Sequence, residues 1–236
     1  SIISQIKKHN LSMKTLVKLF VFFIATTLFA QQPIEKSIGE FTELKVYDLI
    51  EVELVKSNEN KVVITGDNKD DVVVNNKNGT LKIKMSLEEI FDGNNTKVIL
   101  YYTSVDVIDV NEGAKVHSKD DIKQFEVDLK AQEGGIINVP LNVTYTNVKT
   151  VTGGIVTLSG KSKSQDISVS TGGEYYGEKL KTDQTEVSIK AGGNAHVNAS
   201  KLADIKIRAG GDVYVYGNPE TVNESKALGG RVKRMN

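Results

Sequence analysis

Side chains that could do chemistry recur in this sequence at one fixed offset from a repeated glycine pair. Four residues after the first glycine of each repeat stands a column of seven side chains: His117, Asn138, Thr157, Tyr176, His196, Tyr214 and Lys233. The imidazoles of His117 and His196 are potential zinc ligands. They lie four repeats apart, however, and about 4.8 Å per repeat predicts a separation of about 19 Å. One ion cannot bind both, so we predict no metal site.

The C-terminal half of this column is aromatic. Tyr176, His196 and Tyr214 come from three consecutive repeats, and Tyr216 follows two residues after the last of them. If the repeats stack, the rings form a strip that could hold a sugar ring or a partner's side chain. Neighbouring rings could equally stack on one another and stabilise the fold. Tyr176, His196, Tyr214 and Tyr216 are therefore candidate ligand-binding residues, with both interpretations open.

No catalytic pattern accompanies these residues. The column contains no carboxylate, the other acids follow no evident repeat, and no Walker, Rossmann or GxSxG spacing occurs. The GGxGxD pattern of calcium-binding solenoids is also missing. We predict a non-enzymatic protein without catalytic residues or cofactors. A carbohydrate-active β-helix enzyme is the second alternative, since a fold alone does not exclude it.

The glycine pairs that set the offset return about every 19 residues. They are Gly134-Gly135, Gly153-Gly154, Gly172-Gly173, Gly192-Gly193, Gly210-Gly211 and Gly229-Gly230, with Glu112-Gly113 as a weaker upstream copy. Mostly apolar side chains stand three and five residues to either side, which predicts two short strands per unit, joined by a tight turn. One unit cannot bury its apolar face alone, so about seven units are expected to stack as an all-β parallel β-helix. An antiparallel barrel or sandwich is the competing architecture.

Three segments are expected along the chain. Residues 1–30 contain a probable start at Met13 and read as a signal peptide that is cleaved before Gln31. Residues 31–104 are strand-rich without the glycine period, and form either an irregular N-terminal cap or early rungs. Residues 105–236 are the repeat array. Its last unit has Glu224 and Lys226 at core positions, which is typical of a cap that ends strand addition.

Charge and composition limit the classes of partner that the protein is expected to bind. Removing residues 1–30 takes away four lysines and no acid, which leaves 26 basic and 30 acidic residues and a net charge of about −4. This argues against nucleic acid or an anionic membrane as the main partner. The apolar run in residues 1–30 is short for a membrane span, so we expect no stable span after cleavage. With no cysteine, the chain has no disulfide framework.

The order of features resembles a known family. The matching segments read FTELKVYDLIEVELVKSNENKVVITGD, NGTLKIKM, KVILYYTSVDVIDVNEGAKV, the glycine repeats, and YGNPETVNESKALGGRVKRM. The family is described as a "putative auto-transporter adhesin, head GIN domain" and is common in Bacteroidetes. The resemblance implies a right-handed parallel β-helix and a role in adhesion, and brings no catalytic residues with it.

Together these observations predict an exported, non-catalytic protein of the cell envelope, located in the periplasm or on the outer surface of a Gram-negative bacterium. It would act as an adhesin or binding module for a glycan or for an envelope or surface protein. The first alternative is a structural or sensing accessory of the envelope with no adhesive role.

Overall fold

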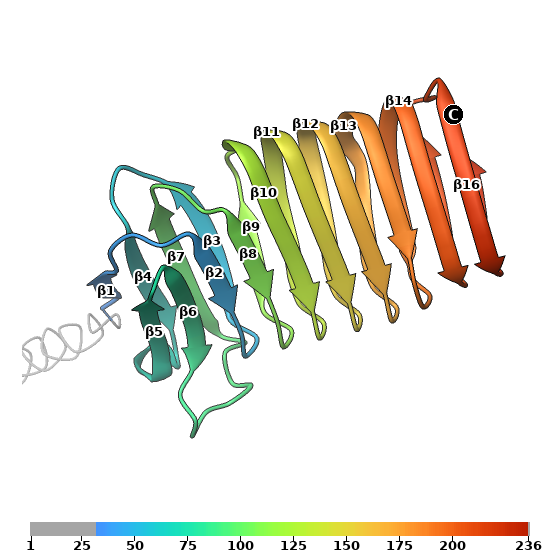
Figure 1. Cartoon of the computed structure of the whole chain (residues 1–236). Coiled ribbons are helices and arrows are strands. Elements are labelled where there is room, and N and C mark those ends of the chain that lie inside the picture. The colour runs from blue at the N-terminus through green and yellow to red at the C-terminus, as the bar shows by residue number, and fades with distance from the viewer. Residues whose placement is uncertain (1–31, 236) are drawn as a thin grey trace, which may run out of the picture. The chain divides into compact units, whose positions relative to one another are not determined.

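The computed structural model describes residues 32–235, and from Ile34 onward these form one compact unit (Figure 1). The predicted signal peptide lies outside the described residues. Seventeen strands join in one continuous hydrogen-bonded arrangement, so the predicted all-β parallel β-helix is confirmed. The described residues contain a single turn of 3₁₀ helix, η1 (Lys69–Asp71), and among them no helix is long and apolar enough to cross a membrane.

The strands fall into an N-terminal group and a repeat group. The first group is β1 (Ile34–Ser37), β2 (Glu43–Val46), β3 (Glu51–Lys56), β4 (Lys61–Gly66), β5 (Val72–Lys77), β6 (Thr80–Met85) and β7 (Thr96–Tyr102). The second is β8 (Val107–Val110), β9 (Lys115–Ser118), β10 (Ile122–Gln132), β11 (Ile136–Val151), β12 (Ile155–Ser170), β13 (Glu174–Ile189), β14 (Asn194–Ala209), β15 (Asp212–Tyr216), β16 (Thr221–Leu228) and β17 (Arg231–Arg234).

Each long strand bends once and so contributes to two sheets. The first part of β11 pairs in parallel with β9, whereas the rest pairs with β10. We call sheet 1 the strand segments that follow a glycine pair, and sheet 2 those that precede one. The two sheets meet at glycine corners, along the bottom of Figure 1, and at far corners, along its top. Successive rungs therefore stack in parallel in both sheets, with register shifts only near the far corners of the β12–β13 and β13–β14 pairs.

The core is built from the four inward columns that the period predicts. Side chains three and five residues from the first glycine are almost all buried, as Ile167, Val169 and Val156 illustrate with exposures of 0%. Equivalent residues pair in successive rungs, for example Val148 with Ile167 and Ile167 with Val187. Because β-branched side chains pack well on a pleated surface, stacking them in columns fills the space between the sheets.

The two glycines of a corner have different tasks, as Gly153-Gly154 shows. Thr152 and Gly153 both have positive φ, 50° and 71°, and the Gly154 N–H donates to the carbonyl of Val151 (3.0 Å), which closes a type I′ turn. A Cβ on Gly153 would meet nothing within 4 Å, whereas one on Gly154 would overlap the Ala131 carbonyl of the rung below. The first glycine supplies the backbone angle, and the second lets neighbouring rungs approach closely.

Residues 34–104 contain both an early rung and an N-terminal cap, which the sequence leaves open as alternatives. β2 and β3 form a rung that pairs with β8 and β9 on one side, and with β6 and β7 on the other. The chain therefore inserts its first rung between two later ones. β4 and β5 then pair antiparallel to β7 and β6, and β1 pairs antiparallel to β4, so these strands cover the N-terminal end.

The C-terminal end carries charge where the other rungs carry core residues. Glu224 pairs with Ile205, Lys226 with Ile207, and Arg234 with Val215. Glu224 and Lys226 lie 3.3 Å apart as an exposed ion pair. The register thus confirms that charged residues replace the apolar columns in the last rung, where a further strand would otherwise add.

Candidate functional site

The structure brings the four predicted ligand-binding residues together on the outer face of sheet 1. Tyr176, His196 and Tyr214 pair in register on β13, β14 and β15. The His196 ring stacks on Tyr214 with 4.4 Å between centroids and 15° between planes, and lies 5.2 Å from Tyr176. Tyr216 joins from the next outward position, with its hydroxyl 3.4 Å from His196 Nδ1.

The orientation of the rings determines whether this aromatic strip can present a ring face to a ligand. The faces of Tyr214 and His196 lie against each other, and Lys233 Nζ stands 5.3 Å over the Tyr214 ring. The Tyr176 hydroxyl donates to Glu174; this bond, with burial, raises the pKa of Tyr176 to about 12, so the phenol stays protonated at neutral pH. Stacked rings present their edges to solvent, whereas a sugar ring packs on an aromatic face. The ligand-binding role of the strip remains a prediction.

His117 has a partner that the sequence column did not contain. β3 extends the column by one rung, so Glu53 pairs with His117, and His117 Nε2 lies 3.8 Å from the Glu53 carboxylate. The column does therefore include a carboxylate. The register also keeps His117 and His196 four rungs apart, and no group of three potential ligands suited to a metal ion occurs within residues 32–235.

A second column, on the outer face of sheet 2, corrects the expectation that the remaining acids follow no repeat. Six residues before the first glycine of each of the six Gly-Gly pairs stand acids and amides in register: Asp128, Asn147, Asp166, Glu186, Asp204 and Asn223. Asn147 Nδ2 donates to Asp128 Oδ1 at 2.7 Å. Aligning the sequence at this offset would have revealed the column, which we call the acid–amide ladder.

Two shallow hollows lie along this ladder and share Asn147 and Asp166. One, of about 160 Å³, is bounded by Tyr145, Gln184 and Glu186; the other, of about 220 Å³, is bounded by Asp128, Lys130 and Lys149. They form a groove of carboxylate, amide and amine groups on sheet 2. Such groups can donate to and accept from many ligand hydroxyls at once.

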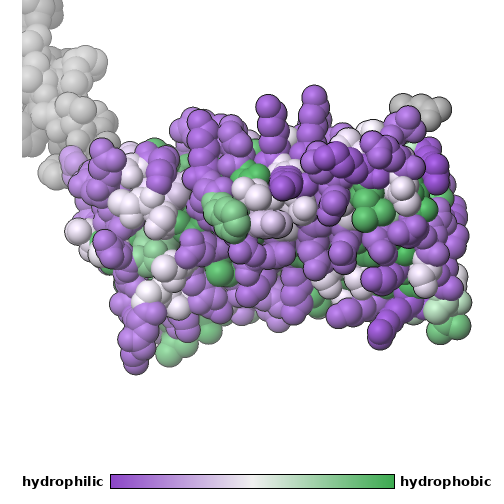
Figure 2. All heavy atoms as spheres, turned by 45° about the horizontal axis from the view of Figure 1, so that its top comes forward, coloured by the Kyte–Doolittle hydropathy of each residue, from purple (hydrophilic) through white to green (hydrophobic). Residues whose placement is uncertain are grey.

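An exposed aromatic pair marks the far-corner rim of the groove. Phe125 is 66% exposed and Tyr145 40%, and their rings meet edge to face with 5.2 Å between centroids. Figure 2 turns this edge toward the viewer, and most of it is hydrophilic with isolated hydrophobic side chains. Sequence reasoning did not single out Phe125 and Tyr145, because they stand at different offsets, nine and eight residues before the first glycine of their repeats, and so fall in different columns.

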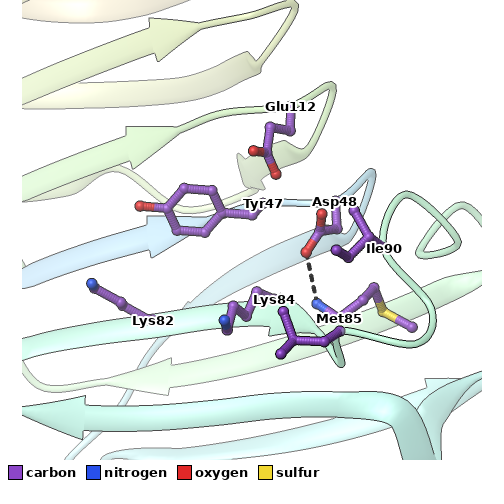
Figure 3. A pocket seen from close by; sticks show the side chains of 8 residues that line it. Tyr47, Asp48, Lys82, Lys84, Met85, Ile90 and Glu112 are labelled. Carbon is purple, nitrogen blue, oxygen red and sulfur yellow. Dashed lines mark hydrogen bonds between the residues drawn. The ribbon is translucent and has the colours of Figure 1, made fainter.

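A third feature is a pocket of about 290 Å³ near the N-terminal rungs (Figure 3). Asp48 and Glu112 occupy equivalent positions of successive corners, and their carboxyl groups lie near each other. The Met85 N–H donates to Asp48 Oδ2 at 3.0 Å. Burial, with the neighbouring Asp48 as a further cause, holds the pKa of Glu112 above its ordinary value. This arrangement joins the β2 corner to the end of β6.

Comparison with protein families shows to which family the chain belongs. The model of the family "Putative auto-transporter adhesin, head GIN domain" matches residues 40–219. The chain belongs to this family. The match covers most of the head GIN solenoid, from the β2/β3 rung to β15. No functionally curated protein is similar enough in sequence to match.

Solved structures share the head GIN fold at low sequence identity. A "putative adhesin" from Bacteroides fragilis NCTC 9343 is 19% identical with a TM-score of 0.79, and the alignment covers 87% of this chain and 98% of that one. A "putative lipid binding protein" from Parabacteroides distasonis ATCC 8503 is 16% identical, with a TM-score of 0.66 and coverages of 88% and 98%. A "putative adhesin" from Parabacteroides merdae ATCC 43184 is 14% identical, with a TM-score of 0.62 and the same coverages.

Proposed function

We propose that this head GIN protein is an exported, non-catalytic binding module that holds glycans at the cell envelope. Export is supported by the signal-peptide pattern in residues 1–30 and adhesion by the family description. A solenoid offers long outward faces rather than a closed cavity, which suits an extended ligand.

The observation that carries the proposal is the exposed Phe125–Tyr145 pair beside the groove. Its edge-to-face geometry uses only one ring face between the two residues, and both side chains remain substantially exposed. The stacked strip of His196 and Tyr214 lacks this freedom. A sugar ring placed on Phe125 or Tyr145 would have polar groups of the groove within reach.

The groove supplies the hydrogen bonds that such a sugar needs. Gln184 offers an amide donor and acceptor, and Asp166 and Glu186 offer acceptors on adjoining rungs. Asn147 offers its amide oxygen, because its nitrogen already donates to Glu126 and Asp128. An aromatic platform flanked by a few planar polar groups fixes both the position and the orientation of a ligand. This combination occurs where β10 and β11 pass the far corner.

A binding experiment with matched variants tests the proposal. The chain from residue 31 onward is screened on a printed glycan array, and the best ligand is titrated by calorimetry. We expect Phe125→Ser with Tyr145→Ser to weaken binding at least about tenfold without lowering the melting temperature. Tyr176→Ser with Tyr214→Ser is the control.

Three results would overturn the assignment. Failure of the wild-type chain to bind any glycan would favour the structural or sensing role. Unchanged binding by the Phe125/Tyr145 variant would remove this pair from the site. Loss of binding only in the Tyr176/Tyr214 variant, at unchanged stability, would move the site to the aromatic strip.

The localisation has its own test, protease treatment of intact cells. A surface adhesin should be cleaved while the outer membrane is whole. Protection until that membrane is broken would exclude direct adhesion to external surfaces and would retain a periplasmic binding role.

One observation favours a carbohydrate-active enzyme as a second candidate. Asp166 and Glu186 stand on adjacent rungs in the groove, and glycosidases use carboxylate pairs. Both side chains are exposed on an open face, whereas hydrolysis needs carboxylates on opposite sides of an enclosed sugar bond. Release of reducing ends by the wild type, lost in Asp166→Asn and Glu186→Gln with binding retained, would establish the enzyme.

A further inference from the structure

Four exposed lysines project from two consecutive far corners. They are Lys161 and Lys163 between the sheet segments of β12, and Lys179 and Lys181 at the same place on β13. All four are exposed, and within residues 32–235 no carboxylate forms an ion pair with any of them. We call these residues the lysine ladder.

The ladder places one pair of like charges, Lys161 and Lys181, directly opposite each other. Lys161 and Lys181 are partners in the parallel register, so their backbones are separated by a single rung of about 4.8 Å. Like charges placed opposite each other on neighbouring strands destabilise a sheet. Asp183, on the same β13 corner as Lys181, is paired with Lys201 at 2.9 Å and is also near enough to Lys163 for this ammonium to help lower the Asp183 pKa. Within residues 32–235 no acid forms an ion pair with Lys161 or Lys181, so the repulsion between these two is not relieved by such a contact.

The ladder continues directly from the exposed aromatic pair. Tyr145 pairs with Ser164, and Asn142 pairs with Lys161, so the rung of Tyr145 lies next to the first lysine rung. Phe125 and Tyr145 therefore precede Lys161, Lys163, Lys179 and Lys181 along one edge of the solenoid. A chain-like ligand that follows this edge would cross two aromatic rings and then four ammonium groups.

We propose that this edge binds an anionic polysaccharide, whose sugar rings pack on the aromatic pair and whose carboxylate, phosphate or sulfate groups lie on the lysine ladder. The inference rests on the proposed function and names its ligand class. Each ammonium is a compact charge with three rotatable donors, which suits anionic groups spaced along a flexible chain.

The acid–amide ladder restricts the shape of the ligand. Asp166 and Glu186 follow Lys161 and Lys181 by five residues, so carboxylates stand at most about 17 Å away on the same rungs. A broad anionic surface, such as a membrane, would press against these acids as well as against the lysines. A single polysaccharide chain that runs along the edge meets the four lysines before it reaches these acids, so local positive charge can hold it although the chain from residue 31 onward has a net negative charge.

The test uses two pairs of polymers that differ in charge. Polygalacturonate is compared with its methyl ester, and dextran sulfate with dextran, by titration against the chain from residue 31 onward. We expect the charged member of at least one pair to bind more tightly, with an affinity that falls as salt rises. The pair that responds identifies the anionic group.

Matched variants assign the effect to the ladder. The ladder variant is Lys161→Gln, Lys163→Gln, Lys179→Gln and Lys181→Gln; the control variant has the same charge change at Lys36, Lys77, Lys82 and Lys84 of the N-terminal rungs. We expect the ladder variant to lose at least about tenfold in affinity and the control variant to lose little. Relief of repulsion should also raise the melting temperature of the ladder variant at low salt.

The outcomes separate this inference from the proposed function. Equal binding of charged and neutral polymers, equal losses in the two lysine variants, or equally strong binding to phosphatidylglycerol vesicles would overturn the ladder's role. Retained binding of a neutral glycan by the ladder variant would then leave the proposed function standing. If the Phe125/Tyr145 variant still binds the anionic polymer in a lysine-dependent way, the aromatic pair is the part that fails.

Discussion

Inside the solenoid, the Tyr175 hydroxyl donates a hydrogen bond of 2.5 Å to Oε1 of Gln165 on the preceding rung. Gln165 Nε2 in turn donates to the Thr185 hydroxyl at 2.8 Å. A Cβ on Gly177 would overlap the Tyr175 ring, so the glycine at this core position leaves the space that the Tyr175 phenol occupies. A polar network thereby replaces aliphatic packing at one level of the core.

Replacing Tyr175 by Phe should destabilise the protein by about 1–3 kcal/mol, because the buried oxygen of Gln165 loses its donor. Tyr176→Phe, on the outer face of the same strand, is the control and should change stability by about 0.5 kcal/mol or less. Guanidinium denaturation measures both. Equal effects of the two changes would mean that the buried bond contributes no more than the surface one.

The two glycines of a corner should respond differently to substitution. Gly154→Ala places a Cβ on the Ala131 carbonyl and should cost at least about 2 kcal/mol. Gly153→Asn keeps the left-handed backbone in open space and should cost about 1 kcal/mol. Comparison of the two midpoints in urea tests this, and a larger loss at Gly153 would contradict the division of tasks.

Thr150 is a defect in the core that substitution should repair. Its side chain is fully buried and Oγ1 finds no hydrogen-bond partner among residues 32–235, whereas Val110 and Val169 fill the same column in other rungs. Thr150→Val should therefore raise the unfolding free energy by about 1 kcal/mol. Thr146→Val is the matched control: Thr146 donates to Ser162 at 2.9 Å, so the same change should destabilise there. A loss of stability in Thr150→Val would indicate an unseen partner for that hydroxyl.

Glu112 should make stability depend on pH. Burial raises the pKa of Glu112 in the folded state above its ordinary value of 4.5, with Asp48 and Glu133 adding to the effect. The folded protein then binds more protons than the unfolded chain, so stability falls as pH rises from about 4.5 through the raised pKa. Glu112→Gln should stabilise the protein at pH 7.5 more than at pH 4. Denaturation curves at both pH values test this, and an equal effect at both would refute it.

The sequence predicted the repeat array well because glycine is required at most of its corners. The β2/β3 rung escaped detection since its corner, Tyr47 to Ile50, contains no glycine: Asp48 and Leu49 adopt φ of 59° and 63° instead. The sequence also could not predict that this rung lies between two later ones, because strands that pair out of chain order produce no periodic pattern in the sequence. Tertiary contacts such as the Met85–Asp48 hydrogen bond stabilise it.

The candidate site was predicted in part. The offset from glycine correctly placed Tyr176, His196 and Tyr214 in one column. Side-chain torsions decide whether rings show faces or edges, and a one-dimensional pattern does not contain them. The acid–amide ladder was accessible at an offset of six residues. Phe125 and Tyr145 were not, because they stand nine and eight residues before the first glycine of their repeats, so no single column of the alignment contains both.

The inserted β2/β3 rung has a consequence for how such proteins change length. At the N-terminal end, β2 and β3 pair with strands on both sides. At the C-terminal end, the charged last rung pairs with the preceding rung and is not repeated elsewhere in the solenoid. Between them, β11 to β14 repeat one structural unit, the bent strand of 16 residues. Duplication of one 19-residue module would lengthen the solenoid by about 4.8 Å and leave both ends intact. The outer faces can thus be extended by whole rungs, each of which adds one position to every column of side chains.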